Sequence, residues 1–396
     1  MLWMRLRMNN AGLFSGIDFF IDQPEMVLKK RNIALITSSS TVDSLGIPVY
    51  DRVGKQAGQH LKSVWSLQHG FFMDKQDNMI LSRSFFWEEL GCEVLSLYGE
   101  ERLPGDDSLK EIDAILVDVF DVGTRVYTFL NHLVMIMKHL SGKGIDLIIL
   151  DRPNPLNGID HEGNILEESH FSMVGMLPVP MRHGLTAGEF MSMALTHFDI
   201  DLNLEIVKVQ GWKRQEYFRG IWTYPSPNMP SFNSALVYPG AVLLEATNLS
   251  EGRGTTRPFE FIGSPFLDSR KLIAALRSHD VKGAGFVPVF FKPEFSKYSG
   301  VVCQGVLVVP ENRNDFKSFE VYYEILRLIM SRYPKQFAWN SPPYEFELER
   351  PPIDVICGSD LIRESLEADM PFESIKKEIE SGIRLYQEHV NDYLLY

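Results

Sequence analysis

The sequence predicts an α/β protein of two domains: a larger domain over residues 1–235 with a mostly parallel sheet, and a smaller α/β domain over residues 236–396. Three observations predict it. The chain has 396 residues, which is more than one hydrophobic core usually serves. Over the first 150 residues, short apolar runs alternate with helical patterns. Residues 224–231 contain three prolines in eight positions, which favours a stiff junction between domains.

The strands of the first domain are expected in five short apolar runs, at residues 32–37, 64–67, 93–98, 114–118 and 146–150. Residues 127–140 are apolar with a helical period, and Thr186 with Glu189 forms a capping box ahead of a helix at 187–196. Buried strands that alternate with helices are typical of a parallel sheet covered on both faces. In such sheets, ligands bind beyond the carboxyl ends of the strands.

The second domain is expected to alternate helices and strands again. Its predicted elements are strands at 285–291 and 305–309 and helices at 272–279, 316–329, 360–368 and 373–393. The last two helices carry mixed charges, as solvent-facing helices usually do.

Composition excludes several classes of function. The formal charge is 39 − 52 = −13 and no cluster of Lys and Arg stands out, which argues against nucleic acid and anionic membranes as partners. Cys92, Cys303 and Cys357 form no CxxC pair, so reduced thiols and no metal site are expected. The chain lacks GxGxxG and GxSxG motifs, so we predict no cofactor and no serine nucleophile.

Targeting signals are also not apparent in the sequence. Residues 1–20 contain no continuous apolar stretch of the kind found in signal peptides, and no apolar run in the chain is long enough to cross a membrane. A cytoplasmic location without membrane insertion is therefore expected, with a periplasmic or secreted location as the alternative if residue 1 is not the natural start of the protein.

Polar groups follow three of the predicted strands, at residues 68–70, 118–125 and 151–155. A single Asp or Asn in such a position is often only a turn former. Three strand ends at one edge of a sheet favour a binding site instead.

Residues 245–260, EATNLSEGRGTTRPFE, are unusually polar. Gly252 and Gly254 bracket Arg253 and permit positive φ, so backbone N–H groups could point inward. Polar groups this dense need partners when buried, so the segment is either an exposed loop or the wall of a pocket. With no metal motif, loops rich in carboxylates, arginines, asparagines and aromatic residues are typical of a carbohydrate site.

Taken in order along nearly the whole chain, these motifs resemble the exo-β-N-acetylmuramidase (NamZ-type) family of peptidoglycan hydrolases. The matching segments are 69–71, 97–99, 121–128, 151–155, 162–163, 182–186, 225–230, 238–240, 247–255, 258–260, 295–298 and 393–396. The resemblance implies a Rossmann-like N-terminal domain, a smaller C-terminal α/β domain and a site in the cleft between them. It also implies release of terminal N-acetylmuramic acid from peptidoglycan fragments.

The resemblance suggests roles for particular residues. Glu251 or Glu162 is the candidate acid/base, Asp121 the electrostatic stabiliser and His69 a group that orients the substrate. The candidate substrate-binding residues are Gln68, Arg125, Asp151, Arg152, Asn154, Arg182, His183, Asn228, Glu245, Asn248, Arg253 and Tyr298. Among the arginines, Arg152, Arg182 and Arg253 are the candidates to bind the lactyl carboxylate of muramic acid.

The chain departs from the family at one motif. Residues 68–73 read Gln-His-Gly-Phe-Phe-Met where the family has Glu-His-Gly-Phe-Arg-Gly, and Phe120 stands where the family tends to have Gln. Glutamine transfers no proton at neutral pH, so Asp121, Glu162, Glu245 or Glu251 would have to act instead. A 2-acetamido sugar could also supply its own nucleophile.

Two other hypotheses remain open. One is a muramyl-sugar-binding protein of the same family without catalysis, motivated by Gln68. The other is an unrelated phosphate- or nucleotide-binding enzyme on the same kind of sheet, which the missing glycine-rich fingerprints disfavour.

Overall fold

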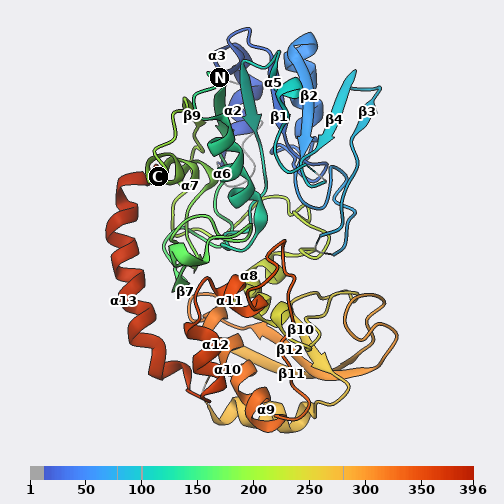
Figure 1. Ribbon diagram of the computed structural model, residues 1–396, viewed down its shortest axis with the longest axis vertical. Helices are drawn as coiled ribbons and strands as arrows, with labels where there is room; N and C mark the ends of the chain where they lie inside the picture. Colours follow the sequence, from blue (N-terminus) through green and yellow to red (C-terminus); the bar gives the residue numbers. More distant parts are fainter. Residues whose placement is uncertain (1–12, 78, 100, 280) are drawn as a thin grey trace.

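The computed structural model describes residues 13–77, 79–99, 101–279 and 281–396. Most of the segment on which the signal-peptide prediction depends, residues 1–12, lies outside the described residues. We call the described residues up to 231 the first half of the chain and residues from 232 on the second half. The first half forms the upper part of the molecule in Figure 1, and the second half forms the lower part. None of the helices in these ranges is both long and apolar enough to cross a membrane.

The first half is built on a seven-stranded sheet of order β3-β4-β2-β1-β5-β6-β9. Its strands are β1 (Ile33–Ile36), β2 (Leu61–Ser66), β3 (Phe85–Trp87), β4 (Cys92–Ser96), β5 (Ala114–Val117), β6 (Asp146–Leu150) and β9 (Leu204–Val207). Only β3 runs antiparallel. The six parallel strands, numbered along the chain, lie in the order 3-2-1-4-5-6, which is that of a Rossmann fold.

The five strands predicted for the first domain are confirmed, and two further strands of this sheet went unpredicted. β3 has only three residues and lies at the edge of the sheet. β9 is half-buried along its length and carries Glu205, so it has neither the alternation nor the apolar run that marks a strand.

Alternate side chains of the strands enter two cores. Leu35, Val64 and Leu116 face one core and Ile36 and Val117 the other. The first core is covered by α2 (Gly16–Asp22), α3 (Pro24–Leu28) and α4 (Val49–Ala57). The second is covered by α6 (Thr128–Leu140) and α7 (Ala187–His197) and continues into the second half of the chain.

The second half contains a three-stranded antiparallel sheet of order β10-β12-β11, with strands β10 (Phe261–Ser264), β11 (Ala284–Phe291) and β12 (Cys303–Pro310). Its helices are α8 (Phe232–Ala241), α9 (Ser269–Ser278), α10 (Ser318–Arg332), α11 (Pro352–Cys357), α12 (Leu361–Glu367) and α13 (Phe372–Val390). α8 was not predicted, because Pro239 and Gly240 lie inside it. Gly240 lets α8 approach α10, since a Cβ there would lie 2.1 Å from the carbonyl oxygen of Ser318.

Smaller elements complete the chain. They are α5 (Asp106–Leu109), the two-stranded ribbon of β7 (Glu162–Ile165) and β8 (Pro180–Arg182), and 3-10 helices at Gly58–His60, Glu168–His170, Val242–Ala246 and Asn391–Tyr393.

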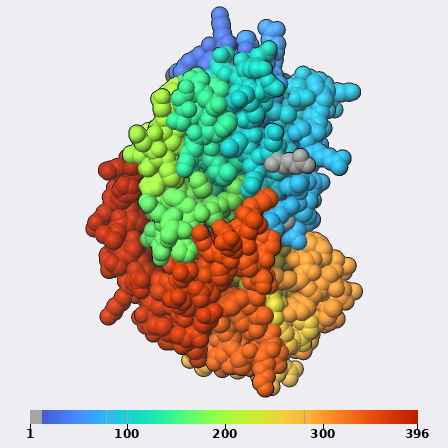
Figure 2. Space-filling view, viewed as in Figure 1, coloured from blue at the N-terminus to red at the C-terminus, as the bar shows by residue number. Residues whose placement is uncertain are grey.

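The two halves are in extensive contact. α13 leaves the second half and runs back along the side of the first, and the space-filling view shows the orange and red surface directly against the green and blue (Figures 1 and 2). The Tyr386 hydroxyl donates to the carbonyl of His183 at 2.7 Å, and the Tyr396 hydroxyl donates to Asp151 at 2.6 Å. The last residues of the chain thus bind the first half.

Candidate active site

A narrow cavity of about 30 Å³ lies between the two halves, where the carboxyl end of β2 faces the second half. The first half contributes the polar residues Gln68, His69, Tyr127, Thr128, Ser226 and Asn228, and the second contributes Tyr238, Glu245, Arg253, Tyr344 and Glu345. Of the residues expected at a site, Gln68, His69, Asn228, Glu245 and Arg253 therefore come together here.

A hydrogen-bonded group of Gln68, Tyr98 and Glu345 lies on one side of this cavity. Gln68 Nε2 donates to Glu345 Oε1 at 2.9 Å and to the Tyr98 hydroxyl at 3.1 Å. The Tyr98 hydroxyl donates to Glu345 Oε2 at 2.8 Å. Thr128 donates its hydroxyl proton to Gln68 Oε1 and so fixes the orientation of the amide. Burial, with a further contribution from the charge of Glu245, raises the pKa of Glu345 to about 7.

Glu345 is held by a tight turn. The backbones of Tyr344 and Glu347 exchange two hydrogen bonds of 2.9 Å, so Glu345 and Phe346 form a two-residue loop. Both have positive φ, 43° and 68°, as the primed hairpin turns require. Non-glycine residues adopt this region at a cost of roughly 1 kcal/mol or more each. Phe346 packs edge-on against Tyr98, with ring centroids 5.7 Å apart, and anchors the turn.

Arg253 is the centre of a cluster of charges that also lines the cavity. It donates to Glu245 Oε1 at 2.6 Å and to Asp77 Oδ1 at 2.9 Å, and lies 3.6 Å from Glu251 Oε1. These carboxylates raise the pKa of Arg253 despite its burial. Tyr344 donates its hydroxyl proton to Glu245 Oε2 at 2.8 Å. The segment EATNLSEGRGTTRPFE thus forms one wall of the cavity.

The glycines of this segment have the expected backbone conformation. Gly252 and Gly254 have φ of 80° and 77°, and a Cβ on Gly254 would lie 2.6 Å from the carbonyl oxygen of Phe295. The N–H of Gly252 donates to Ser250 Oγ and its carbonyl accepts from Thr255 N. These groups order the loop itself.

His69 is neutral at physiological pH, because burial lowers its pKa to about 4. Its Nδ1 lies 2.7 Å from the carbonyl of Lys75, so Nδ1 carries the proton and Nε2 is left as an acceptor. Asn228 Nδ2 donates to the carbonyl of Gln76 at 2.6 Å. Together with the Asp77–Arg253 pair, these contacts hold residues 75–77 against three residues that line the cavity.

The predicted acid/base Glu251 does not line the cavity. Its Oε2 lies 2.9 Å from Lys297 Nζ, and two cations therefore neutralise this buried carboxylate. The structure favours a role in ordering the loop over the proton transfer expected from the sequence.

Glu162 and Arg182 form a buried ion pair outside the cavity. Arg182 Nη1 donates to Glu162 Oε1 at 2.7 Å, and the same guanidinium lies 3.3 Å from Asp160. Glu162 Oε2 accepts from Phe319 N at 3.1 Å, at the first turn of α10, where a carboxylate interacts favourably with the helix dipole. This pair connects the two halves instead of facing the cavity.

Arg125 is also buried away from the cavity. Its guanidinium donates to the carbonyls of Asn164 at 2.9 Å and Val179 at 2.8 Å, both in the first half. It also donates to the carbonyls of Ile356 at 3.2 Å and Cys357 at 2.6 Å, the last two residues of α11. Burial without a carboxylate partner lowers its pKa to about 10. Arg125 therefore contacts the backbone of both halves, and its predicted contact with substrate has no counterpart here.

Asp151 and Arg152 also serve the scaffold. Asp151 accepts from the Thr186 hydroxyl at 2.7 Å and from Gly188 N at 2.9 Å, which orders the start of α7. Burial raises the pKa of Asp151 to about 6. Arg152 Nε donates to Asp118 Oδ1 at 2.7 Å. Neither residue reaches the cavity between the halves.

Asp121, Asn154 and His183 lie together near β8. Asp121 Oδ2 accepts from the N–H of Gly123 at 2.6 Å and lies 3.7 Å from His183 Nε2. Asn154 Nδ2 donates to the carbonyl of Leu185 at 2.9 Å. Asp121 does not line the cavity, so the structure gives no support to its expected role as electrostatic stabiliser.

Asn248 and Tyr298 complete the predicted set and order loops. Asn248 Nδ2 donates to the carbonyl of Gln336 at 2.7 Å, and its Oδ1 accepts from Ala338 N at 3.0 Å. Tyr298 has a φ of 59°, and its carbonyl accepts from Val301 N at 2.9 Å.

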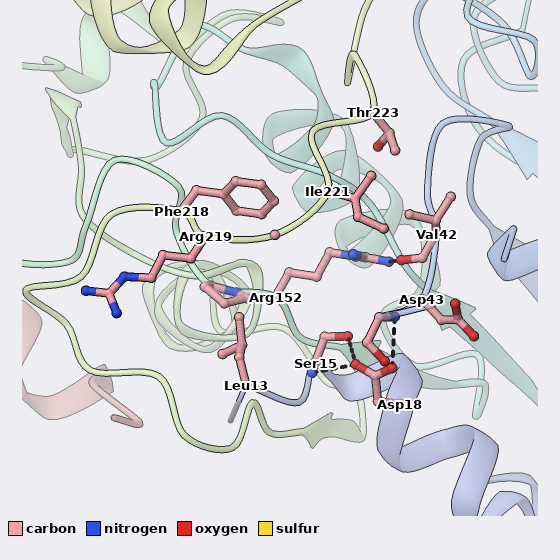
Figure 3. Close-up of a pocket in the computed structure, with 13 residues that line it drawn as sticks. Leu13, Ser15, Asp18, Val42, Asp43, Arg152, Phe218, Arg219, Ile221 and Thr223 are labelled. Carbon is pink, nitrogen blue, oxygen red and sulfur yellow. Dashed lines mark hydrogen bonds between the residues drawn. The ribbon is translucent and has the colours of Figure 1, made fainter. Parts of the chain in front are cut away.

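A larger hollow of about 320 Å³ lies beside the carboxyl ends of β1 and β6 (Figure 3). In a Rossmann fold, dinucleotides bind near such a position. Here Ser15 donates to Asp18 from both its N–H and its hydroxyl, and Arg152 is held by Asp118 and by the carbonyl of Val42. The described charged groups at its centre are thus already paired within the scaffold.

Sequence reasoning missed Glu345, Tyr98 and Tyr344. Tyr98 lies in a segment that matches the family, but it was not assigned a role. Glu345 follows the two prolines of Pro342-Pro-Tyr-Glu345, and a carboxylate between aromatic residues in a proline-rich loop is the one signal that could have found it. Within the ranges that the structure describes, no three His, Cys, Asp or Glu side chains gather as a metal site would require.

Comparison with known proteins identifies the family. Residues 33–233 match the family model described as exo-β-N-acetylmuramidase NamZ, N-terminal, and residues 236–396 match the model described as exo-β-N-acetylmuramidase NamZ, C-terminal. The chain is 35% identical over 385 residues to the peptidoglycan β-N-acetylmuramidase NamZ of Bacillus subtilis (strain 168), covering 96% of this chain and 91% of that protein.

Solved structures agree on the fold. A DUF1343 family protein of Bacteroides fragilis NCTC 9343 has a TM-score of 0.87 at 27% identity, with 98% of this chain and 99% of that chain covered. A second protein of the same family and organism has a TM-score of 0.73 at 24% identity, with 97% and 99% covered, and supports the fold alone. With both family models matched and a curated relative aligned over nearly its full length, this chain belongs to the exo-β-N-acetylmuramidase NamZ family.

Proposed function

We propose that this protein is a glycoside hydrolase that releases terminal N-acetylmuramic acid from the non-reducing end of peptidoglycan fragments. Family membership across both halves of the chain supports this reaction. The observation that carries the substrate assignment is the buried guanidinium of Arg253 in the cavity between the halves. Muramic acid differs from glucosamine by a lactyl carboxylate, and an arginine fork is the group best suited to bind it.

Arg253 already has carboxylate neighbours, and they are not equivalent. Glu245 and Glu251 have side chains 5% and 2% exposed, whereas the Asp77 side chain is 45% exposed. Of these three described carboxylates, Asp77 is the one that can leave without stranding a buried charge. We infer that the lactyl carboxylate takes the position of Asp77 on Arg253.

The size of the cavity supports the same exchange. Its volume of about 30 Å³ is about a tenth of that of the 320 Å³ hollow beside the sheet. A sugar ring needs more room than this, and we infer that the cavity widens when Asp77 leaves Arg253. A narrow cavity reached in this way admits the end of a glycan rather than its middle, as an exo-acting enzyme requires.

The function is tested with two disaccharides, one with muramic acid and one with glucosamine at the non-reducing end. We expect free N-acetylmuramic acid from the first and no product from the second, measured by mass spectrometry. If the protein binds N-acetylmuramic acid in calorimetry but releases none, it is the sugar-binding alternative, and the hydrolase assignment is wrong.

Replacing Asp77→Asn is expected to tighten binding of N-acetylmuramic acid about fivefold, because a half-exposed ion pair with Arg253 contributes at most roughly 1 kcal/mol. Binding of N-acetylglucosamine should not change, since it has no carboxylate to compete. Calorimetry with both sugars measures this. Asp74→Asn is the matched control, because Asp74 is similarly exposed and pairs only with Lys75 among the contacts described. Weaker muramic acid binding in the Asp77 variant would contradict the exchange.

A further inference from the structure

We infer that Glu345 is the carboxylic acid that protonates the leaving oxygen of the glycoside, and that Gln68 and Tyr98 position it. This rests on the proposed function and names the proton donor of that site. The family's glutamate is glutamine at position 68 in this chain, so a carboxyl group has to come from elsewhere. Glu345 reaches the same place from the other half, with Oε1 2.9 Å from Gln68 Nε2.

The surroundings of Glu345 suit a proton donor. The side chain is 3% exposed, lines the cavity and has no described cation within salt-bridge distance. Its pKa, raised to about 7 by burial, leaves a large fraction protonated at neutral pH. Each carboxyl oxygen meets one donor, Gln68 Nε2 or the Tyr98 hydroxyl, which leaves further lone-pair directions for substrate.

Glu245 provides the contrasting carboxylate. It also lines the cavity, but it accepts from Arg253 at 2.6 Å and from Tyr344 at 2.8 Å. The site thus contains two carboxyl groups in different surroundings. Burial favours the neutral form of Glu345, whereas Glu245 is bound to a guanidinium. Such a difference usually separates the general acid from the electrostatic stabiliser. Glu245 therefore carries the negative charge that stabilises the oxocarbenium-like transition state.

The backbone at Glu345 points to the same role. Positive φ at two successive non-glycine residues is strain that the surrounding contacts have to sustain, and such strain concentrates at functional sites. Phe346 sustains it by packing against Tyr98 and under Arg102, whose guanidinium carbon lies 4.1 Å from the ring centroid. The turn presents the carboxyl group to Gln68 in one fixed orientation.

The carboxyl proton of Glu345 moves to the glycosidic oxygen while the bond from the anomeric carbon to that oxygen breaks, and the bonding electrons stay with the oxygen. The leaving sugar departs as an alcohol. Water then adds its hydroxyl to the anomeric carbon, and its remaining proton restores the Glu345 carboxyl. No oxidant, reductant or cofactor is consumed.

The test compares Glu345→Gln with the wild type on two substrates: a muramyl disaccharide, and a dinitrophenyl muramide whose leaving group needs no protonation. We expect kcat/KM to fall about 10²- to 10⁴-fold on the disaccharide and less than about tenfold on the aryl glycoside. Binding of N-acetylmuramic acid by Glu345→Gln, measured by calorimetry, shows that the variant is folded. Glu349→Gln is the control, because Glu349 is exposed on the same loop.

A second variant tests Gln68 as the positioning residue. In Gln68→Glu, a second carboxyl group beside Glu345 should raise the pKa of the pair, since two neighbouring carboxylates resist ionising together. The rate of the wild type should fall as the pH rises above about 7, because the protonated form of Glu345 is the donor. In Gln68→Glu this basic limb should move to higher pH.

The outcomes distinguish the identity of the proton donor from the hydrolase activity itself. If the wild type cleaves both substrates and Glu345→Gln loses both activities equally, or loses neither, Glu345 is not the acid. The proposed muramidase activity then still stands. A wild type that cleaves neither substrate overturns the hydrolase and the proton donor together. If the basic limb of the pH–rate profile does not move in Gln68→Glu, Gln68 does not act on Glu345 as a positioning residue.

Discussion

Replacing Arg125→Met is expected to lower the free energy of unfolding by about 3 kcal/mol or more, and is the largest stability effect we expect from one substitution. Methionine fills most of the volume but donates no hydrogen bond. Four buried carbonyls, of Asn164, Val179, Ile356 and Cys357, would lose the guanidinium that they share. Two of them end α11, where a cation also offsets the negative end of the helix dipole.

Urea unfolding followed by tryptophan fluorescence measures the effect. Arg384→Met is the matched control, because Arg384 is exposed on α13, and its change should stay within about 0.5 kcal/mol. A loss below about 1 kcal/mol in the Arg125 variant would show that water replaces the guanidinium easily, and that the contact does not hold the halves together.

Arg125 also shows where prediction from sequence stops. Its position after β5 correctly placed it at the carboxyl edge of the sheet, because strand ends are local features. Its partners Ile356 and Cys357 lie 231 and 232 residues away. A polar residue at a strand end can face a ligand or the backbone of another domain, and only the packed structure distinguishes the two.

The same limit explains why Glu345 went unpredicted while Gln68 was noticed. Gln68 follows an apolar strand and lies in a recognisable motif, so its position and its departure from the family could both be seen in the sequence. Glu345 is 277 residues from Gln68 and lies in a turn whose positive φ values are atypical of Glu and Phe. Tertiary contacts hold that turn, and no local pattern encodes them.

The buried strands and long helices were predictable for the opposite reason. β1 and β5 are apolar without interruption, β6 is apolar after Asp146, and α10 is long and rich in apolar residues, so each element carries its own signal. The cavity between the halves carries no such signal, since its walls come from strand ends, a proline-rich loop and a turn near residue 345.

Arg253→Lys is expected to reduce the affinity for N-acetylmuramic acid about 10- to 100-fold, while the affinity for N-acetylglucosamine stays the same. Lysine keeps the positive charge beside Glu245 and Glu251, so the fold is preserved, but it lacks the fork that binds a carboxylate through two hydrogen bonds. The quantity to measure is the ratio of the two dissociation constants, since a general structural defect would weaken both sugars alike.

The control for this substitution is Arg257→Lys. Arg257 lies on the same loop, half-exposed at 50%, and pairs with Glu260, so the ratio should not change there. An unchanged ratio in Arg253→Lys would place the lactyl carboxylate elsewhere. Arg253→Lys and Asp77→Asn together form a double-mutant cycle. In the Arg253→Lys background, Asp77→Asn should no longer improve muramic acid binding about fivefold. The reason is that Asp77 and the lactyl carboxylate compete for the guanidinium of Arg253, which this background lacks.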